Sequence, residues 1–251
     1  MKTIHFILLW LALPFNDVSA QEAEENCEFY TYINKKFGSF SIAPIDSILM
    51  NEGGFGNRAY YTLTPMGWSE DGSLFLMEDN SYLIGGYVYK FKKIQFSANP
   101  EMELFDFEQD IEKSPCETVS ELEQLTDKVL VRHHVIVDSN KIGYVSQFGN
   151  DFFRYRGFNC TITHGKKHDT IELYKYGASK HLVKKYISKN LPPTWPGEHS
   201  CQSFIDIAGY FVNPFNPMQI IIHVFEREGC GFENAESFNN MFIPVDLNEY
   251  P

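Results

Sequence analysis

The sequence lacks the short motifs that identify the common catalytic and redox chemistries. It has no Gly-x-Ser-x-Gly segment, so the nucleophile elbow of the α/β-hydrolases is excluded. None of its five cysteines forms a Cys-x-x-Cys pair, the usual signature of thioredoxin-like redox chemistry and of zinc ribbons. The glycine-rich segment 53–56 is followed neither by the Gly-Lys-Ser/Thr of a P-loop nor by a helix at the Rossmann spacing. We therefore expect no cofactor and a non-catalytic protein.

Positive charge is also scarce. The chain has 21 lysine and arginine residues against 33 aspartate and glutamate residues, which gives a net charge of −12. Such a surface repels phosphate backbones and anionic lipid headgroups, and its ordinary consequence is solubility. We therefore expect no nucleic-acid partner. The exception is a set of lysines within 178–190, which is either a solvated face or a docking surface for an acidic partner.

Long apolar runs are missing, apart from one near the N-terminus. Residues 4–15, apolar except for His5, follow Lys2 and precede Val18-Ser19-Ala20, an order typical of a secretory signal peptide. A run of about twelve residues is shorter than the ~20 that a membrane-spanning helix needs. We expect residues 1–20 to be cleaved and residues 21–251 to form a single secreted or periplasmic domain with no membrane span. Cleavage removes one lysine and one aspartate, so the charge stays at −12.

The cysteines are consistent with an oxidising compartment, but their spacing does not define a pattern of disulfide pairing. All lie after residue 20, so one or two disulfides are expected among them. An odd number leaves at least one cysteine free or paired between chains, and the spacing leaves the connectivity open. The disulfide candidates are Cys27, Cys116, Cys160, Cys201 and Cys230. Asn159 begins an Asn-Cys-Thr sequon, whose glycosylation depends on the host.

Short segments bounded by glycine and asparagine predict a mainly β protein of the α+β class, built from antiparallel sheets of short strands. Near the N-terminus, segments 59–64 and 74–78 form a hairpin whose Asp-Gly pair favours a tight turn. A long strand follows over 82–96, and its alternation changes parity at Lys92-Lys93, which predicts a bulge or a change of face. The remaining strands are predicted at 135–138, 141–148, 152–156, 159–164 and 169–176, with a closing three-strand meander at 203–212, 218–225 and 238–245.

Helical spacing occurs twice. Leucine and valine recur at that spacing over 119–131, behind a capping box that runs from Thr118 to Glu121. A second helix is predicted over 178–190, with apolar residues on one face and lysines on the other. The polar, acidic segment 97–117 predicts a connecting loop, which is also the candidate boundary between two sub-domains.

Two segments resemble a family of predicted secreted bacterial proteins of unknown function. Residues 67–75 contain the aromatic-Ser-x-Asp-Gly strand–turn–strand pattern of propeller-like blades. Residues 209–214 match the closing Gly-Tyr-x-x-x-Pro strand, and residues 231–233 match the Gly-Phe-Glu loop. The resemblance implies secretion and a β-rich fold but no reaction. Since a propeller needs several such copies at regular spacing and this chain has one, we expect a single blade-like motif.

The blade-like turn also supplies the candidate binding residues, which are Trp68, Ser69, Asp71 and Gly72. A second turn carries His164, His168 and Asp169, and two imidazoles with a carboxylate are a known metal-ligand set. Two lysines between those histidines would repel a cation. We therefore expect no metal, and keep these three residues as the alternative.

These observations favour a secreted or periplasmic, non-catalytic binding or envelope-associated protein whose partner is an unknown protein or small ligand. The competing hypothesis is a secreted hydrolase with an acidic active site, built from carboxylates of segment 101–112 or from the His164 and His168 turn. A third hypothesis is a structural subunit, in which an edge strand of the closing meander pairs with another chain.

Overall fold

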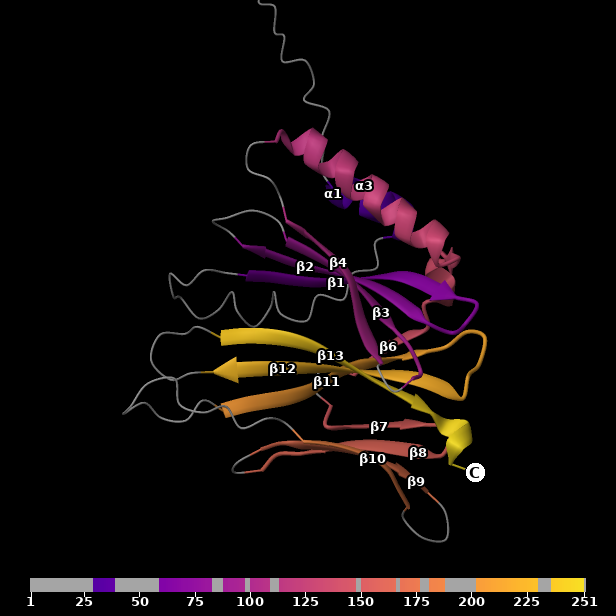
Figure 1. Ribbon diagram of the computed structural model, residues 1–251. Coiled ribbons are helices and arrows are strands. Elements are labelled where there is room, and N and C mark those ends of the chain that lie inside the picture. Colours follow the sequence, from indigo (N-terminus) through magenta and orange to yellow (C-terminus); the bar gives the residue numbers. More distant parts are fainter. Residues whose placement is uncertain are drawn as a thin grey trace, which may run out of the picture.

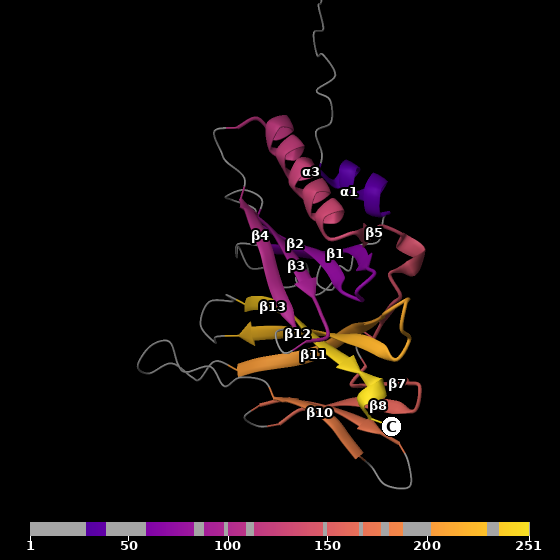
Figure 2. The same cartoon turned by 45° about the vertical axis from the view of Figure 1, so that its right-hand side comes forward.

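The computed structural model describes residues 29–38, 59–82, 88–97, 100–108, 113–147, 150–165, 168–176, 181–187, 202–229 and 236–250. Within these residues the chain forms two α-helices and three antiparallel sheets, which we call sheets A, B and C. Figures 1 and 2 show them stacked as four layers: the helices cover sheet A, sheet B lies beneath it, and sheet C lies beneath sheet B. The predicted mainly β, α+β class is confirmed. The expected signal peptide, residues 1–20, lies outside the described residues.

Sheet A has the strand order β4-β3-β2-β1-β5. Its strands are β1 (Ala59–Ser69), β2 (Leu74–Tyr82), β3 (Val88–Ile94), β4 (Glu101–Glu108) and β5 (Val135–Ile136). The predicted hairpin of β1 and β2 is confirmed, with a register shift between Pro65 and Gly67. A side chain at Gly67 is impossible, because a Cβ there would lie 2.3 Å from the carbonyl oxygen of Ile136, and its φ is 147°. This glycine therefore lets β5 approach β1.

Two helices cover the outer face of sheet A. They are α1 (Phe29–Phe37), which the sequence did not predict, and α3 (Pro115–Arg132), which contains the predicted segment 119–131. The expected capping box was displaced by one turn, because Ser114 is the N-cap and pairs with Glu117. Both helices and sheet A bury one apolar cluster, made of Ile33, Phe37, Met66, Phe75, Met77, Tyr89, Phe91, Phe107, Leu122, Val129 and Leu130.

Sheet B contains the predicted closing meander. Its order is β13-β12-β11-β6, from strands β6 (Tyr144–Ser146), β11 (Gln202–Val212), β12 (Gln219–Gly229) and β13 (Glu236–Asp246). Sheet C has the order β10-β9-β8-β7, from strands β7 (Phe152–Tyr155), β8 (Phe158–Thr163), β9 (Thr170–Lys175) and β10 (His181–Ile187). Short 3₁₀ turns, η1 (Ser139–Lys141) and η2 (Leu247–Glu249), precede β6 and follow β13.

Two segments differ from the sequence prediction. Residues 181–187, expected to be helical, form β10, where a register shift between Leu182 and Lys184 interrupts the strand alternation. Residues 101–108, expected to be part of a loop, form β4, whose alternating charges lie along the edge of sheet A. The predicted irregularity at Lys92 is confirmed, because the pairing of β3 with β4 shifts between Phe91 and Lys92.

Strand alternation divides the side chains of sheet B between its two neighbours. Along β12, Ile220, Ile222 and Val224 join the cluster that packs on sheet C, whereas Ile221 joins the cluster that packs on sheet A. The period of two along a strand explains this division. Sheet B is therefore buried on both faces.

The described residues include two α-helices and two cysteines. No helix in this part of the chain is both long and apolar enough to cross a membrane. Cys160, on β8, is a buried free thiol, and burial raises its pKa to about 12. Cys116, in α3, is disulfide-bonded. Three other cysteines, Cys27, Cys201 and Cys230, lie outside the described residues.

Candidate functional site

The four residues of the blade-like motif form the tight turn between β1 and β2. Trp68 is 1% exposed and donates its indole N–H to the carbonyl oxygen of Ile142 at 3.1 Å. Ser69 is also buried, and Gly72 takes a φ of 80° that favours glycine. The aromatic ring of Trp68 therefore packs in the core between sheets A and B, and a ligand at this turn stays a prediction.

Asp71 is the exposed member of that turn. Its carboxylate accepts hydrogen bonds from the Ser69 hydroxyl and from the backbone N–H of Ser73, and Lys93 lies 3.2 Å from its other oxygen. Burial alone would raise the pKa of Asp71, but these three partners outweigh it and hold the pKa well below its usual range. The carboxylate is thus engaged in shaping the turn.

The turn between β8 and β9 brings together two of the three residues of the metal alternative. Asp169 is buried and accepts hydrogen bonds from the backbone N–H groups of Gly165 and of Ile205 on β11. His164 Nδ1 lies 3.2 Å from Asp169, and its Nε2 lies 3.5 Å from Asp151. Burial lowers the pKa of His164, but the two carboxylates outweigh it and raise the pKa overall.

His168 is not part of this contact network. Among the described residues, no group of three or more histidine, cysteine, aspartate or glutamate side chains is arranged to hold a metal ion. In the structure both ring nitrogens of His164 face carboxylates, an arrangement that suits an imidazolium ion. The metal alternative at this turn stays a prediction.

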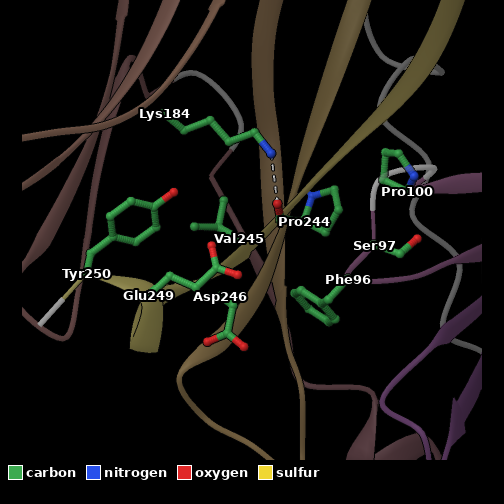
Figure 3. A pocket seen from close by; sticks show the side chains of 9 residues that line it. All are labelled: Phe96, Ser97, Pro100, Lys184, Pro244, Val245, Asp246, Glu249 and Tyr250. Carbon is green, nitrogen blue, oxygen red and sulfur yellow. Dashed lines mark hydrogen bonds between the residues drawn. The ribbon is translucent and has the colours of Figure 1, made fainter.

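A pocket forms where sheets A, B and C meet at one end of the stack. We call it the three-sheet pocket; its volume is about 370 Å³. Figure 3 shows its lining, which comes from the β3–β4 connection, from β10 and from the end of β13 with η2. The lining residues are Phe96, Ser97, Pro100, Lys184, Pro244, Val245, Asp246, Glu249 and Tyr250. The lining thus combines rings and aliphatic groups with the charged side chains of Lys184, Asp246 and Glu249.

Lys184 supplies the positive charge of the pocket. The bulge in β10 turns its side chain to the inner face of sheet C, because Lys184 pairs with the buried Leu173. The ammonium donates one hydrogen bond to the carbonyl oxygen of Pro244, at 3.1 Å, which Figure 3 shows as a dashed line. Burial lowers the pKa of Lys184 more than the charge of Glu249 raises it.

Two carboxylates face the pocket from the chain that follows β13. The carboxylate of Asp246 is hydrogen-bonded within the protein. It accepts hydrogen bonds from the backbone N–H of Asn248 at 3.0 Å and from the Gln219 side chain at 2.8 Å. Glu249 makes no hydrogen bond or ion pair with the residues that the structure describes. Figure 3 shows both carboxylates beneath Val245, with Tyr250 on one side and Phe96 on the other.

A chain of polar side chains crosses the interior between sheets A and B. His223, on β12, is fully buried; its Nε2 lies 2.8 Å from the Asn240 side-chain oxygen and its Nδ1 lies 3.4 Å from the Tyr144 hydroxyl. The neutral tautomer with hydrogen on Nε2 satisfies both contacts. Burial lowers the pKa of His223 to about 4, with the nearby charge of Lys92 adding to the effect.

The chain of polar groups continues into sheet A. Lys92 lies 3.0 Å from Glu78 and 2.7 Å from Glu101, and Asn240 lowers the pKa of the Glu78 carboxyl. Burial has the larger effect and raises the pKa of Glu78, whose Oε1 has no hydrogen-bond partner within the described structure. We call Glu78, Lys92, Glu101, Tyr144, His223 and Asn240 the polar network. Since most of it is closed to solvent, it serves packing better than it serves ligand binding.

No protein-family profile, curated protein or solved structure matches the chain. The fold and the candidate site therefore rest on the residues described above.

Sequence reasoning did not find the three-sheet pocket. Its walls come from segments 96–100, 184 and 244–250, which are separated by more than fifty residues at each step. No local pattern joins such segments, because period-two alternation describes a single strand and not the layer that packs on it. The sequence contains one weak signal for the pocket. Lys184 is among the lysines of segment 178–190, which were predicted to lie on one face of a helix.

Proposed function

We propose that this chain is an exported, non-catalytic binding protein that holds a small ligand in the three-sheet pocket. The observation that carries the proposal is the pocket itself, in which Lys184 and Glu249 are charged groups without an ion-pair partner in the described structure. The third charged group of the lining, Asp246, is fixed by hydrogen bonds, which favours a preformed pocket.

Export is supported by the N-terminal pattern of residues 1–20 and by the disulfide-bonded state of Cys116. The resemblance to secreted bacterial proteins of unknown function agrees with it and belongs to the same proposal. Export can be tested by expressing the full chain in a bacterial host and measuring the intact mass of the exported protein. We expect a mature chain that begins at Gln21. Ala20→Trp, which places a large residue at the cleavage site, should block processing, and a wild-type chain retained at full length would contradict export.

The hydrolase hypothesis has less support from the described residues. In the acidic segment 101–112, Glu101 and Glu103 lie on the edge strand β4 and face Lys92 and Lys90, at 2.7 and 3.6 Å. Ion pairing on a sheet edge explains these charges without a reaction. Residues 109–112 lie outside the described residues.

The binding proposal can be tested by thermal unfolding of the purified protein against separate panels of amino acids, amines, sugars and short peptides. A ligand at one hundred times its Kd should stabilise the protein by about 2.7 kcal/mol. For a chain of this size that corresponds to an increase in Tm of about 5 to 10 °C.

Two variants assign any shift to the pocket. Ser97→Trp places an indole in the pocket lining and should abolish the shift, whereas Thr163→Trp, at an exposed position on β8, should leave it intact. A shift that survives in Ser97→Trp would place the ligand elsewhere. A flat response of the wild-type protein to every panel would reject a small-ligand function for this pocket.

A further inference from the structure

Two opposite charges face the three-sheet pocket without contacting each other. Lys184 and Glu249 are near enough for the carboxylate to raise the pKa of the lysine, yet no ion pair joins them within the 4.0 Å that defines one. An ammonium carries three donors, and the Pro244 carbonyl occupies one of those on Lys184. Donors on one group and acceptors on the other are therefore available to a third molecule.

Apolar groups lie beside these two charges in the pocket lining, together with the polar side chains of Ser97, Asp246 and Tyr250. Phe96 and Pro100 come from the connection between β3 and β4, and Pro244 and Val245 come from β13, so rings and branched chains lie beside the two charges (Figure 3). Proline has a fixed φ and loses little entropy when a ligand binds against it. Such walls accept a side chain of apolar or aromatic character.

From this arrangement we infer that the ligand is a zwitterion of amino-acid size, in which a carboxylate binds Lys184, an ammonium binds Glu249, and an apolar side chain packs on Phe96. This inference rests on the proposed function and names the ligand class of the same pocket. A volume of about 370 Å³ is near the lower end of ligand cavities, which fits one amino acid better than a polymer.

Singly charged ligands fit the pocket less well. A simple anion would pair with Lys184 but would also face Asp246 and Glu249, and a simple amine would offer no negative charge to Lys184. A neutral sugar would leave both charges uncompensated. Only a ligand with both signs satisfies the two groups together.

The experiment is calorimetric titration with three matched probes: L-phenylalanine, L-phenylalaninamide, which lacks the carboxylate, and N-acetyl-L-phenylalanine, which lacks the ammonium. We expect L-phenylalanine to bind the wild-type protein at least about tenfold more tightly than either analogue, since charge-assisted hydrogen bonds contribute most among polar contacts. Equal binding of all three probes would overturn the inference.

The variants test each charge separately. Lys184→Gln should weaken the binding of L-phenylalanine about tenfold. It should leave the affinity for L-phenylalaninamide unchanged, because that probe already lacks the carboxylate that binds Lys184. Glu249→Gln should weaken the binding of L-phenylalanine by a similar factor and leave the affinity for N-acetyl-L-phenylalanine unchanged. The assigned pairing is wrong if Lys184→Gln also weakens the binding of L-phenylalaninamide about tenfold. It is equally wrong if Glu249→Gln weakens the binding of N-acetyl-L-phenylalanine about tenfold.

Matched controls come from the other face of the same sheet. Lys185, next to Lys184 on β10, lies 3.2 Å from Glu172 on β9, away from the pocket lining. Lys185→Gln and Glu172→Gln remove one charge of each sign there and should leave all three affinities unchanged. A comparable loss of affinity in these controls would show that net charge, and not the pocket, determines binding, and would overturn the inference.

Failure of this inference can be distinguished from failure of the proposed function. If L-phenylalanine does not bind but another panel, such as the sugars, gives a thermal shift that Ser97→Trp abolishes, the pocket binds a ligand of another class. If no panel gives a shift that depends on Ser97, both proposals fail.

Discussion

The two interfaces of sheet B bury side chains of different kinds. On the side of sheet C, its residues pack in a cluster of aliphatic and aromatic groups, among them Ile222, Val224 and Leu173. On the side of sheet A, the apolar cluster surrounds buried polar groups, including His223 and the ion pair of Lys92 with Glu78. Both faces of the sheet therefore bury apolar area, and the face toward sheet A also buries an ion pair whose contribution depends on both partners.

The difference determines how each interface responds to change. When atoms are removed from an apolar interface, the free energy of unfolding falls gradually. The reason is that the hydrophobic effect is non-directional and proportional to the buried area. A buried ion pair is different, since removing one partner leaves the other charge without compensation in a medium of low dielectric constant. The polar network should thus make the pairing of sheets A and B specific, whereas the interface between sheets B and C contributes mainly stability.

The largest expected effect comes from breaking the buried ion pair. Lys92→Met should lower the free energy of unfolding by about 3 to 5 kcal/mol, because Glu78 and Lys92 are both less than a tenth exposed. Urea denaturation measures this loss. The exposed pair of Lys90 with Glu103 provides the control, and Lys90→Met should cost under about 1 kcal/mol. Equal losses in the two variants would show that burial of the pair adds nothing.

The second effect is a dependence on pH from His223. Its pKa is about 4 in the folded protein and 6.5 in the unfolded chain, so the unfolded state binds more protons between these values. Stability is therefore full above pH 6.5 and falls by up to about 3 kcal/mol as the pH drops toward 4. His223→Gln should reduce this slope in thermal melts recorded across that range. An unchanged slope would mean that other groups control the acid response.

A smaller effect is expected in the apolar interface. Ile222→Val removes one methylene from the cluster between sheets B and C, and the free energy of unfolding should fall by about 0.5 to 1.5 kcal/mol. Denaturation at pH 5 and pH 8 should give the same loss, since no titratable group is removed. A loss that varied with pH would contradict the assignment of Ile222 to apolar packing.

The smallest effect should come from His164, at the rim of the apolar interface, and its sign is opposite to that of His223. The pKa of His164 is raised in the folded protein, so its contribution is present below its unfolded value of 6.5 and is lost as the pH rises through the folded value. Because the side chain is about half exposed, the change should stay below about 1 kcal/mol. His164→Gln should lower Tm at pH 5 and leave it unchanged at pH 9; a loss at pH 9 would point to packing instead.

Local patterns in the sequence predicted the elements whose signals are local. The Asp71-Gly72 turn, the helix that contains Leu122 and the closing meander were all found, because turn chemistry and side-chain periodicity act within a few neighbouring residues. Residues 181–187 were misassigned because a strand bulge before Lys184 mimics helical spacing. The strand at 101–108 was missed because its alternating acidic residues were taken for a loop.

By itself, the sequence determined the β-rich class of the protein, the hairpins and one helix, because alternation and spacing are properties of short segments. Tertiary structure alone decided which face of each sheet meets which neighbour. It placed Trp68 in the core although the turn containing it was expected to bind a ligand, and it joined His223 to Asn240 and Tyr144. It also assembled the three-sheet pocket from distant segments. The physical reason is that contacts between layers depend on the packing of whole faces, whose partners lie far apart along the chain.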